Sequence, residues 1–399
     1  MVHGALIGAY QEDDSGGLRA LLPLAGRTLL EYQVRCASAA GTAPIVVVVE
    51  RVPQALQDAF ERLRLDGIGV FAVSDVHEAV SRFEAGSMIL VIGDGIAPTA
   101  GLVTTIGEEP EPAIATVPDD EVHEMFERID SETRWAGVAL VDSKTLGSTA
   151  AILGDWDLQS TLLRRAVQDG ALRWPVGGGN GAEPLLVERA EQLDGFQRTL
   201  LAGSREPRRD WASRYVLPPI EEFATQQLME TAVRPGWLVW AALGLTFAAA
   251  GAFSRGWLAA GLVLLTLSTP LDIIASRLAT LRLKPLPKRA LSRRLLWPAA
   301  GIALLALGIW ESRHGGGGWG SIMAAVAAAA FAEAARLEGM PGLPGEQWLL
   351  SRRNAILLAI PFALFGAWTT YLIVLFVYAA ASFFYLQHVR RIASELTRS

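Results

Sequence analysis

The sequence predicts an α/β domain followed by an all-α transmembrane domain of six helices. Two observations lead to this division. Apolar residues make up 51% of the 399-residue chain and charged residues only 19%, which is unusual for a soluble protein. The apolar residues are concentrated after about residue 235, whereas the preceding part has an ordinary density of charge. We therefore expect a first domain at 1–205, a juxtamembrane segment at 206–234 and a membrane domain at 235–399.

The first domain is predicted from β-rich runs that alternate with helical patterns. Strands are expected at 3–10, 44–50, 67–72, 87–93, 113–117 and 137–141. Helices are expected at 28–40, 54–64, 75–85 and 156–169. The continuous apolar run at 45–49 is typical of a parallel strand that is covered on both faces. Such alternation favours an open α/β sheet that binds ligands at the carboxyl ends of its strands.

The membrane domain is predicted from its apolar runs, because a helix that crosses a bilayer needs about 20 mostly apolar residues. Six spans are expected near 236–254, 256–275, 295–310, 317–335, 354–368 and 370–387. The loop at 277–294 contains seven Arg or Lys residues, and the positive-inside rule places such loops in the cytoplasm. We therefore expect a multi-pass protein of the inner (cytoplasmic) membrane, with the first domain and both termini in the cytoplasm.

The remaining sequence features give weak signals or disfavour other kinds of site. The segment at 210–234 mixes aromatic, basic and acidic residues, which is compatible with an interfacial helix or with a plain linker. Cys36 is the one cysteine of the chain, so no intrachain disulfide is expected. The N-terminus has no signal-peptide pattern, and the histidines have no zinc spacing. No nucleic-acid-binding module is visible, and the glycine run at 177–181 is expected to be a surface turn.

The stretch RALLPLAGRTLLEY at residues 19–32 follows the first predicted strand. It resembles the start of nucleotidyltransferases of the molybdenum-cofactor guanylyltransferase and sugar-phosphate cytidylyltransferase type. The resemblance implies a Rossmann-like (GT-A-type) fold whose glycine-rich loop binds a nucleoside triphosphate. It implies catalytic roles for Arg19 and Asp94, with Asp94 also holding Mg²⁺ if the enzyme is active. The nucleotide-binding positions that it implies are Gly8, Ala9, Gly16 and Gly17.

The loop between the first strand and Arg19 departs from the family pattern. Ala9 stands where the family has a second glycine, and Arg19 replaces a lysine, which keeps the charge but changes its geometry. Glu12, Asp13 and Asp14 lie where the triphosphate would bind, and like charges repel. Two alternatives therefore stay open, an active nucleotidyltransferase and a folded domain without catalysis.

The run TPLDIIASR at residues 269–277 lies at one end of the second predicted span. It resembles a degenerate copy of the membrane CDP-alcohol phosphotransferase signature, Asp-x-x-Asp-Gly-x-x-Ala-Arg, in which Asp272 and Arg277 are retained. The resemblance implies a family fold in which acids hold CDP through a divalent metal. Three of the four acids are replaced, and the replacements are Thr269, Ala290 and Arg294.

One carboxylate is too few for a Mg²⁺ site, because this ion prefers several oxygen ligands. CDP-alcohol phosphotransferase activity is therefore not expected of the membrane domain. Charges within a membrane generally pair with each other. We accordingly expect Asp272 to pair with Arg277 or Arg282.

The order of the two domains is similar to that of bifunctional inositol-phosphate cytidylyltransferase/CDP-inositol phosphotransferases. It implies a membrane protein of CDP-alcohol or polyol-phosphate metabolism, as in phospholipid biosynthesis, with a nucleoside triphosphate and membrane lipid as ligands. The alternative is a catalytically inactive pseudoenzyme that serves as a scaffold or regulatory subunit for an active homologue. The alanine-rich run at 324–330 is compatible with a homodimer, because small residues let helices approach closely.

Overall fold

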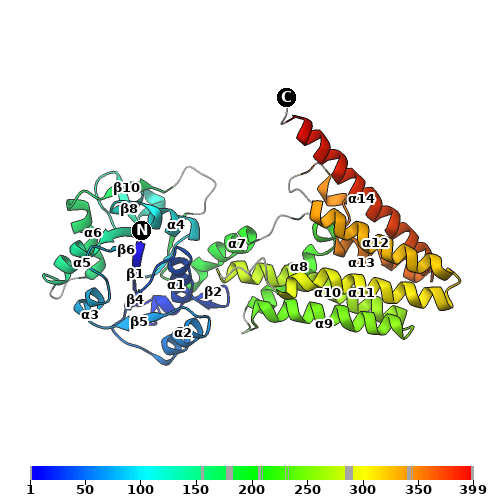
Figure 1. Cartoon of the computed structure of the whole chain (residues 1–399). Helices are drawn as coiled ribbons and strands as arrows, with labels where there is room; N and C mark the ends of the chain where they lie inside the picture. Colours follow the sequence, from blue (N-terminus) through cyan, green and yellow to red (C-terminus); the bar gives the residue numbers. More distant parts are fainter. Residues whose placement is uncertain are drawn as a thin grey trace. The chain divides into compact units, whose positions relative to one another are not determined.

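The computed structural model describes residues 2–153, 157–176, 183–204, 208, 210–229, 231, 233–283, 291–338, 343 and 345–396. The glycine run at 177–181 and the replaced acid position Ala290 lie outside the described residues. The chain forms two compact units, Met1–Ser204 with Thr280–Lys284, and Arg205–Ala279 with Pro285–Ser399. We call them the α/β unit and the helical unit (Figure 1).

The α/β unit contains a seven-stranded sheet in the order β10-β8-β9-β6-β1-β4-β5. The strands are β1 (Val2–Gly8), β4 (Ile45–Val48), β5 (Val70–Val73), β6 (Met88–Ile92), β8 (Ala113–Pro118), β9 (Thr133–Asp142) and β10 (Leu172–Pro175). β1 pairs in parallel with β4 and β6, and β4 pairs in parallel with β5. β9 runs antiparallel between β6 and β8. The parallel strands have almost uninterrupted apolar sequences, because both faces of the sheet are covered.

Helices cover both faces of this sheet (Figure 1). On one face, α3 (Val76–Ser81), α5 (Ser143–Ala150) and α6 (Leu158–Gln168) share one apolar core with the strands. On the other face, α1 (Leu29–Ala39) and α4 (Ala100–Glu108) pack against each other. Helix α2 (Gln54–Leu65) contacts the edge strand β5, and α7 (Leu193–Gly203) follows the sheet in sequence. The α/β prediction is therefore confirmed as a mainly parallel sheet between helical layers.

The centre of the sheet has the topology that creates a binding crevice. After β1 the chain forms β4 on one side of β1, and it later forms β6 on the other side. β1 and β6 are neighbours, and the chain leaves their carboxyl ends toward opposite sides of the sheet. Ligands of open α/β sheets bind at such a switch point.

A glycine bulge in β9 shapes the loop that follows β6. Gly137 has a φ of +82°, and its carbonyl accepts a hydrogen bond from the N–H of Gly93 at 2.8 Å. The space where a side chain of residue 137 would lie is filled by Ile96, which is 3% exposed. Ile96 begins the short strand β7 (Ile96–Ala97), which pairs with β11 (Leu185–Leu186). The bulge thus fixes the chain on both sides of Asp94.

The helical unit contains α9 (Pro235–Ser254), α10 (Leu258–Leu281), α11 (Leu291–His314), α12 (Gly318–Glu338), α13 (Arg352–Leu364) and α14 (Trp368–Leu396). Within the described residues, five of these helices are long and apolar enough to cross a membrane. Helix α13 has 13 residues, which corresponds to only about 20 Å of helix, whereas the hydrocarbon core is about 30 Å thick. Five of the predicted spans are therefore confirmed as helices of that kind within the described residues. The count of six is not confirmed, because the span expected at 354–368 forms the shorter helix α13.

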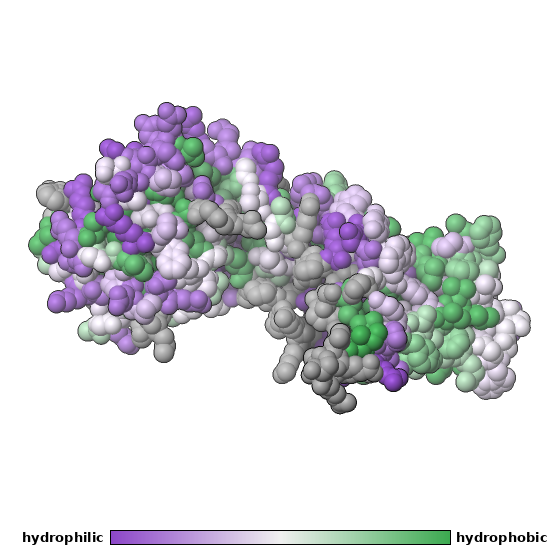
Figure 2. All heavy atoms as spheres, turned by 90° about the horizontal axis from the view of Figure 1, so that it is seen from above, coloured by the Kyte–Doolittle hydropathy of each residue, from purple (hydrophilic) through white to green (hydrophobic). Residues whose placement is uncertain are grey.

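The helices of this unit pack through small residues and expose large apolar ones. Ala303 of α11, Ala325 of α12 and Ala359 of α13 lie in one buried core. Trp237, Trp319 and other large apolar side chains are exposed, and Figure 2 shows hydrophobic patches on the surface of the unit. This inside-out distribution fits helices that lie in lipid.

The segment before α9 is helical where it is described. It forms a π-helical turn (Ala212–Val216) and α8 (Pro218–Met229). Glu221 of α8 is 3% exposed, so part of this segment packs inside the helical unit. The plain-linker alternative does not describe this packed helix.

Replacing Gly137 by alanine is expected to lower the midpoint of thermal unfolding of the protein. An alanine Cβ would lie 2.4 Å from Cγ1 of Ile96, and overpacking of this kind costs about 1–3 kcal/mol. The positive φ adds about 1–2 kcal/mol of backbone strain. Circular dichroism of the full chain in detergent, recorded during heating, measures the change.

Gly170→Ala is the matched control for this variant. Gly170 has a φ of +83°, but no atom lies within 4 Å of its added Cβ. Only the backbone strain is then expected. Equal midpoints for the two variants would show that Ile96 does not fill the Gly137 site as described.

Candidate functional site

Asp94 lies at the switch point of the sheet, directly after β6. Its side chain is buried, and its Oδ2 accepts hydrogen bonds from the backbone N–H groups of Tyr10 at 2.6 Å and Gln11 at 2.7 Å. These two residues follow β1, so the carboxylate joins the ends of the two central strands. Its second oxygen, Oδ1, is buried and has no hydrogen-bond partner among the described residues. A buried carboxylate oxygen without a partner is costly unless a ligand completes it.

The surroundings of Asp94 combine burial with negative charge. Burial raises the pKa of Asp94, and the N–H groups of Gln11 and Tyr10 partly oppose this rise. The Tyr10 hydroxyl donates to Asp157 Oδ2 at 2.9 Å. Burial and the neighbouring Asp157 raise the pKa of Tyr10. Burial also raises the pKa of Glu127, which accepts a hydrogen bond from Ser160 at 2.9 Å.

Gly8 and Ala9 connect β1 to Tyr10 and Gln11, whose N–H groups bind Asp94. An added Cβ at Gly8 would lie 2.3 Å from Nε2 of Gln159 and 3.1 Å from Cβ of Asp94. Gln159 in turn accepts a hydrogen bond from the N–H of Asp94 at 3.0 Å. Ala9 is fully buried and donates its N–H to Val48 at 2.9 Å. A side chain at position 8 would therefore displace Gln159, whereas the buried position 9 accommodates the methyl group of alanine.

The loop between Gln11 and Leu18 is closed by its own acid. Oδ1 of Asp13 accepts from the N–H groups of Ser15 and Gly17, each at 2.8 Å, and from the Ser15 hydroxyl at 2.7 Å. These bonds lower the pKa of Asp13, the Ser15 hydroxyl contributing most. Gly16 takes a φ of +79°, which lets the loop turn back. The backbone donors expected to bind a phosphate are thus engaged by a carboxylate of the same loop.

The other two acids of this loop are held by arginines. Glu12 pairs with Arg51 at 2.7 Å, and Asp14 pairs with Arg189. Arg51 also donates to the Gly16 carbonyl at 3.0 Å. Both acids are therefore paired with arginines of the same unit. This pairing reduces the repulsion that their sequence predicts between these acids and a bound triphosphate.

Arg19 lies next to this loop and close enough to Asp94 to lower its pKa. Its guanidinium donates to Gln11 Oε1 at 3.1 Å, to the Glu12 carbonyl at 3.0 Å and to Glu188 Oε1 at 3.0 Å. Gly95, with a φ of +68°, lets the Arg19 side chain approach, because an added Cβ would lie 3.0 Å from Arg19 Cδ. The structure thus brings Gly8, Asp94 and Arg19 together at the carboxyl ends of β1 and β6.

A divalent metal fits this site only together with a substrate. Among the described residues, no group of three or more His, Cys, Asp or Glu side chains could hold a metal ion. The free Oδ1 of Asp94 supplies one ligand. Mg²⁺ commonly takes one or two carboxylates and completes its octahedron with water and substrate phosphates.

In the helical unit, the retained signature residues bind partners that differ from those predicted. In the part of the chain that the structure describes, Arg277 is not among the recorded partners of Asp272. Its Oδ2 accepts from Arg353 at 2.7 Å and its Oδ1 accepts from Arg352 at 3.4 Å. Both arginines lie in the first turn of α13. They are about 80 residues from Asp272 in sequence, so the sequence alone does not indicate this contact. The nearby basic loop suggested other partners because the bundle brings α13 against α10.

Arg277 binds an acid that precedes the membrane helices. It donates to Glu221 Oε1 at 3.0 Å, and both side chains are almost fully buried. Arg208 lies 3.7 Å from the other oxygen of Glu221. Thr269, at the first replaced acid position, is also buried and donates its hydroxyl to the carbonyl of Thr266.

Several site residues had no clear sequence signal. Tyr10 and Gln11 act through their backbone N–H groups, which any residue supplies. Gln159 and Glu188 come from distant parts of the chain, so only the fold brings them to Asp94 and Arg19. The pair Arg352–Arg353 stands at the start of an apolar run, and that position is the one signal that could have identified it.

Comparisons with known proteins give matches among solved structures. No protein-family model matches the chain. No curated protein matches it. Among 193 matching chains of solved structures is one described as a glucose-1-phosphate thymidylyltransferase from Bacillus anthracis in complex with a sucrose. It is 12% identical, with a TM-score of 0.40, and the match covers 50% of this chain and 95% of that chain.

Replacing Asp13 by alanine is expected to speed hydrogen exchange at the amides of Ser15 and Gly17. Both amides lose a charged acceptor, and a hydrogen bond to a charged group is worth about 1.5 kcal/mol or more, which corresponds to about tenfold faster exchange. Hydrogen–deuterium exchange of the full chain, read by mass spectrometry, measures the effect.

Asp14→Ala is the control, because it removes a charge from the same loop but only the pairing with Arg189. Little change in the exchange of Ser15 and Gly17 is expected for it. Equal acceleration in both variants would contradict the assignment of Asp13 as the acid that closes the loop.

Proposed function

We propose that the α/β unit is a nucleotide-binding domain of the nucleotidyltransferase type, carried by a multi-pass membrane protein. The observation that carries this proposal is the carboxylate of Asp94 at the switch point of the sheet. One oxygen is fixed by two backbone N–H groups, and the other is buried without a partner. An acid held in this way suits the binding of a metal-bound phosphate.

In this proposal each residue has a separate task. Gly8 lets the backbone pass close to Asp94, and the N–H groups after β1 orient its carboxylate. Arg19 supplies a positive charge toward the phosphates, and Gly16 and Gly17 supply backbone donors once Asp13 has released them. Mg²⁺, when bound at Asp94, would neutralise the charge that develops on the phosphates during nucleotidyl transfer.

The acceptor proposed is a polyol phosphate or a related alcohol phosphate, as the order of the two domains implies. Its phosphate oxygen would attack the α-phosphorus of the nucleoside triphosphate, and pyrophosphate would leave. Because basic residues gather in the loop at 277–294, we further propose that the α/β unit and both termini lie in the cytoplasm.

A second function is favoured by the closed loop. Asp13 engages the N–H groups of Ser15 and Gly17, and Arg19 is paired with Glu188. A domain that keeps these contacts would bind a nucleotide weakly and would not turn it over. The chain would then be a pseudoenzyme that acts as a scaffold or regulatory subunit for an active homologue.

The expected result for the first function is Mg²⁺-dependent binding of a nucleoside triphosphate that is lost in Asp94→Asn. The amide keeps an acceptor for the N–H groups but removes the negative charge that a metal requires, so affinity is expected to fall about tenfold or more. Titration calorimetry of the full chain in detergent, with CTP, GTP and ATP and with or without Mg²⁺, measures it. Asp58→Asn, an exposed acid on α2, is the control.

Pyrophosphate release separates the two functions. With a polyol phosphate, Mg²⁺ and the nucleotide that binds, the enzyme is expected to release pyrophosphate. Binding without release supports the pseudoenzyme. Absence of binding for all three nucleotides, with and without Mg²⁺, overturns the nucleotide-binding proposal itself.

The same binding is expected to weaken on acidification. The raised pKa of Asp94 means that its carboxylate takes up a proton at a higher pH than an ordinary aspartate. Mg²⁺ requires the deprotonated form, so affinity should be complete well above that pKa and fall as the pH drops through it. Calorimetry over a range of pH tests this. Affinity that is independent of pH down to the ordinary aspartate range, about 4, would contradict it.

A further inference from the structure

Two cavities of the helical unit meet at the same two side chains. An apolar cavity of about 370 Å³ lies inside the bundle. A second cavity of about 230 Å³ lies where α10 approaches its end and where α11 and α13 begin. Trp297 and Arg352 line both cavities. An apolar compartment is therefore directly adjacent to a polar one.

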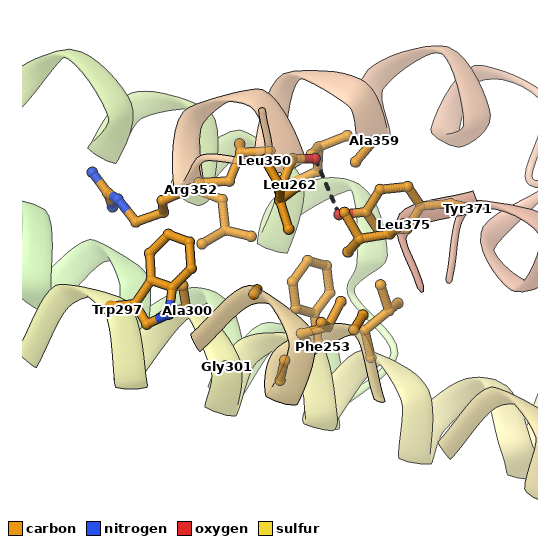
Figure 3. A pocket seen from close by; sticks show the side chains of 18 of the residues that line it. Phe253, Leu262, Trp297, Ala300, Gly301, Leu350, Arg352, Ala359, Tyr371 and Leu375 are labelled. Atoms are coloured by element: carbon orange, nitrogen blue, oxygen red, sulfur yellow. Dashed lines mark hydrogen bonds between the residues drawn. The ribbon is translucent and has the colours of Figure 1, made fainter. Parts of the chain in front are cut away.

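The apolar cavity suits a hydrocarbon chain. Its lining includes Phe253, Leu262 and Leu375, together with small residues of α11 and α12. The hydroxyl of Tyr371 donates to the carbonyl of Ala355 at 3.1 Å, so its hydrogen is bonded within the protein and does not require an acceptor on a ligand. Figure 3 shows Arg352 and Trp297 at one end of the cavity and Tyr371 and Leu375 at the other.

The second cavity is lined mainly by cations. Its charged lining consists of Asp272 and five arginines, namely Arg293, Arg294, Arg336, Arg352 and Arg353. The carboxylates recorded against these arginines are Asp272 itself, Asp210 at 2.9 Å from Arg353 and Glu333 at 2.8 Å from Arg336. Guanidinium groups therefore make up most of the charged lining of this cavity.

One guanidinium in this cavity has spare donor capacity. Nε of Arg353 is buried and has no hydrogen-bond acceptor among the described residues. Arg294 is exposed and stands where the family signature would place its last acid. Arginine forks match phosphate oxygens well, and they favour an anion without help from a metal.

We propose that the helical unit binds a lipid with a phosphate monoester headgroup. The phosphate lies in the arginine-lined cavity, and one chain of the lipid lies in the apolar cavity. A phosphate monoester carries about −1.5 to −2 charges at pH 7, which suits a cavity whose charged lining is mainly guanidinium groups. This binding uses no residue of the α/β unit and is independent of the function proposed for that unit.

Phosphatidic acid is the probe for the first test. The full chain in detergent is titrated with dioleoyl phosphatidic acid, with dioleoyl phosphatidylcholine, with dioleoylglycerol and with inorganic phosphate, and bound species are counted by native mass spectrometry. Phosphatidic acid is expected to bind at least about tenfold more tightly than the other three. Dioleoylglycerol lacks the phosphate, inorganic phosphate lacks the chain, and the choline of phosphatidylcholine would place a cation among the arginines.

Two variants probe the two cavities separately. Arg294→Ala removes an exposed arginine of the phosphate cavity, and affinity for phosphatidic acid is expected to fall about tenfold. Gly301→Leu fills the apolar cavity, because Gly301 lines it and no atom lies within 4 Å of its added Cβ. The lipid is expected to be excluded from this variant.

Matched controls exist for both changes. Arg255→Ala removes an exposed arginine at the end of α9, and Gly244→Leu adds a side chain to α9 where no atom lies within 4 Å of the added Cβ. Neither residue lines the two cavities. Both controls are expected to bind phosphatidic acid as the parent protein does.

Two outcomes would overturn the proposal. If inorganic phosphate binds as tightly as phosphatidic acid and Gly301→Leu changes neither, the arginine cavity takes a water-soluble phosphate. If phosphatidic acid and phosphatidylcholine bind alike and no variant affects either, the lipid merely surrounds the bundle. Loss of phosphatidic acid in both Arg294→Ala and Gly301→Leu, with both controls unchanged, supports the proposal.

Discussion

The ion pairs of Asp272 with Arg352 and Arg353 hold together the arginine-rich end of the helical unit. A carboxylate among apolar helices costs several kcal/mol unless it is paired and hydrogen-bonded. Arg352 and Arg353 meet this requirement, and Arg353 also binds Asp210 at 2.9 Å, before the first membrane helix. The pairs therefore fix α13 against α10 and against the preceding segment.

The same constraint shapes the crevice of the α/β unit. Asp13, Glu12 and Asp14 each have a partner, and those partners are backbone N–H groups, Arg51 and Arg189. Because these acids are partly exposed, their contacts are worth much less than those of Asp272. The loop can therefore exchange them for contacts with a ligand. The buried network in the helical unit cannot be exchanged in this way without leaving a charge unpaired.

Much of the fold could be predicted from sequence, because continuous apolar runs and alternation with helical patterns identify β1, β4 and β6 directly. Helices α4 and α5 were not predicted, since they are short and depend on packing against the sheet. The resemblance to nucleotidyltransferases identified Asp94 as a candidate. Its free oxygen, the closure of the loop by Asp13 and the pairing of Asp272 with Arg353 could not be predicted, because side-chain partners separated by tens of residues are set by the tertiary fold.

The two units differ in how they can meet a phosphate. Asp94 has one oxygen without a partner among the described residues, and its other oxygen accepts from neutral N–H groups. A cation that arrives with a nucleotide would therefore meet only one nearby positive charge, that of Arg19. Both oxygens of Asp272 already accept hydrogen bonds from guanidinium groups. A metal at Asp272 would be repelled by two arginines, and it would leave them without their carboxylate. The arrangement opposes a metal-bridged phosphate in the helical unit and agrees with the proposed direct contact between arginine and phosphate, whereas the unpartnered oxygen of Asp94 agrees with the proposed metal-bound nucleotide.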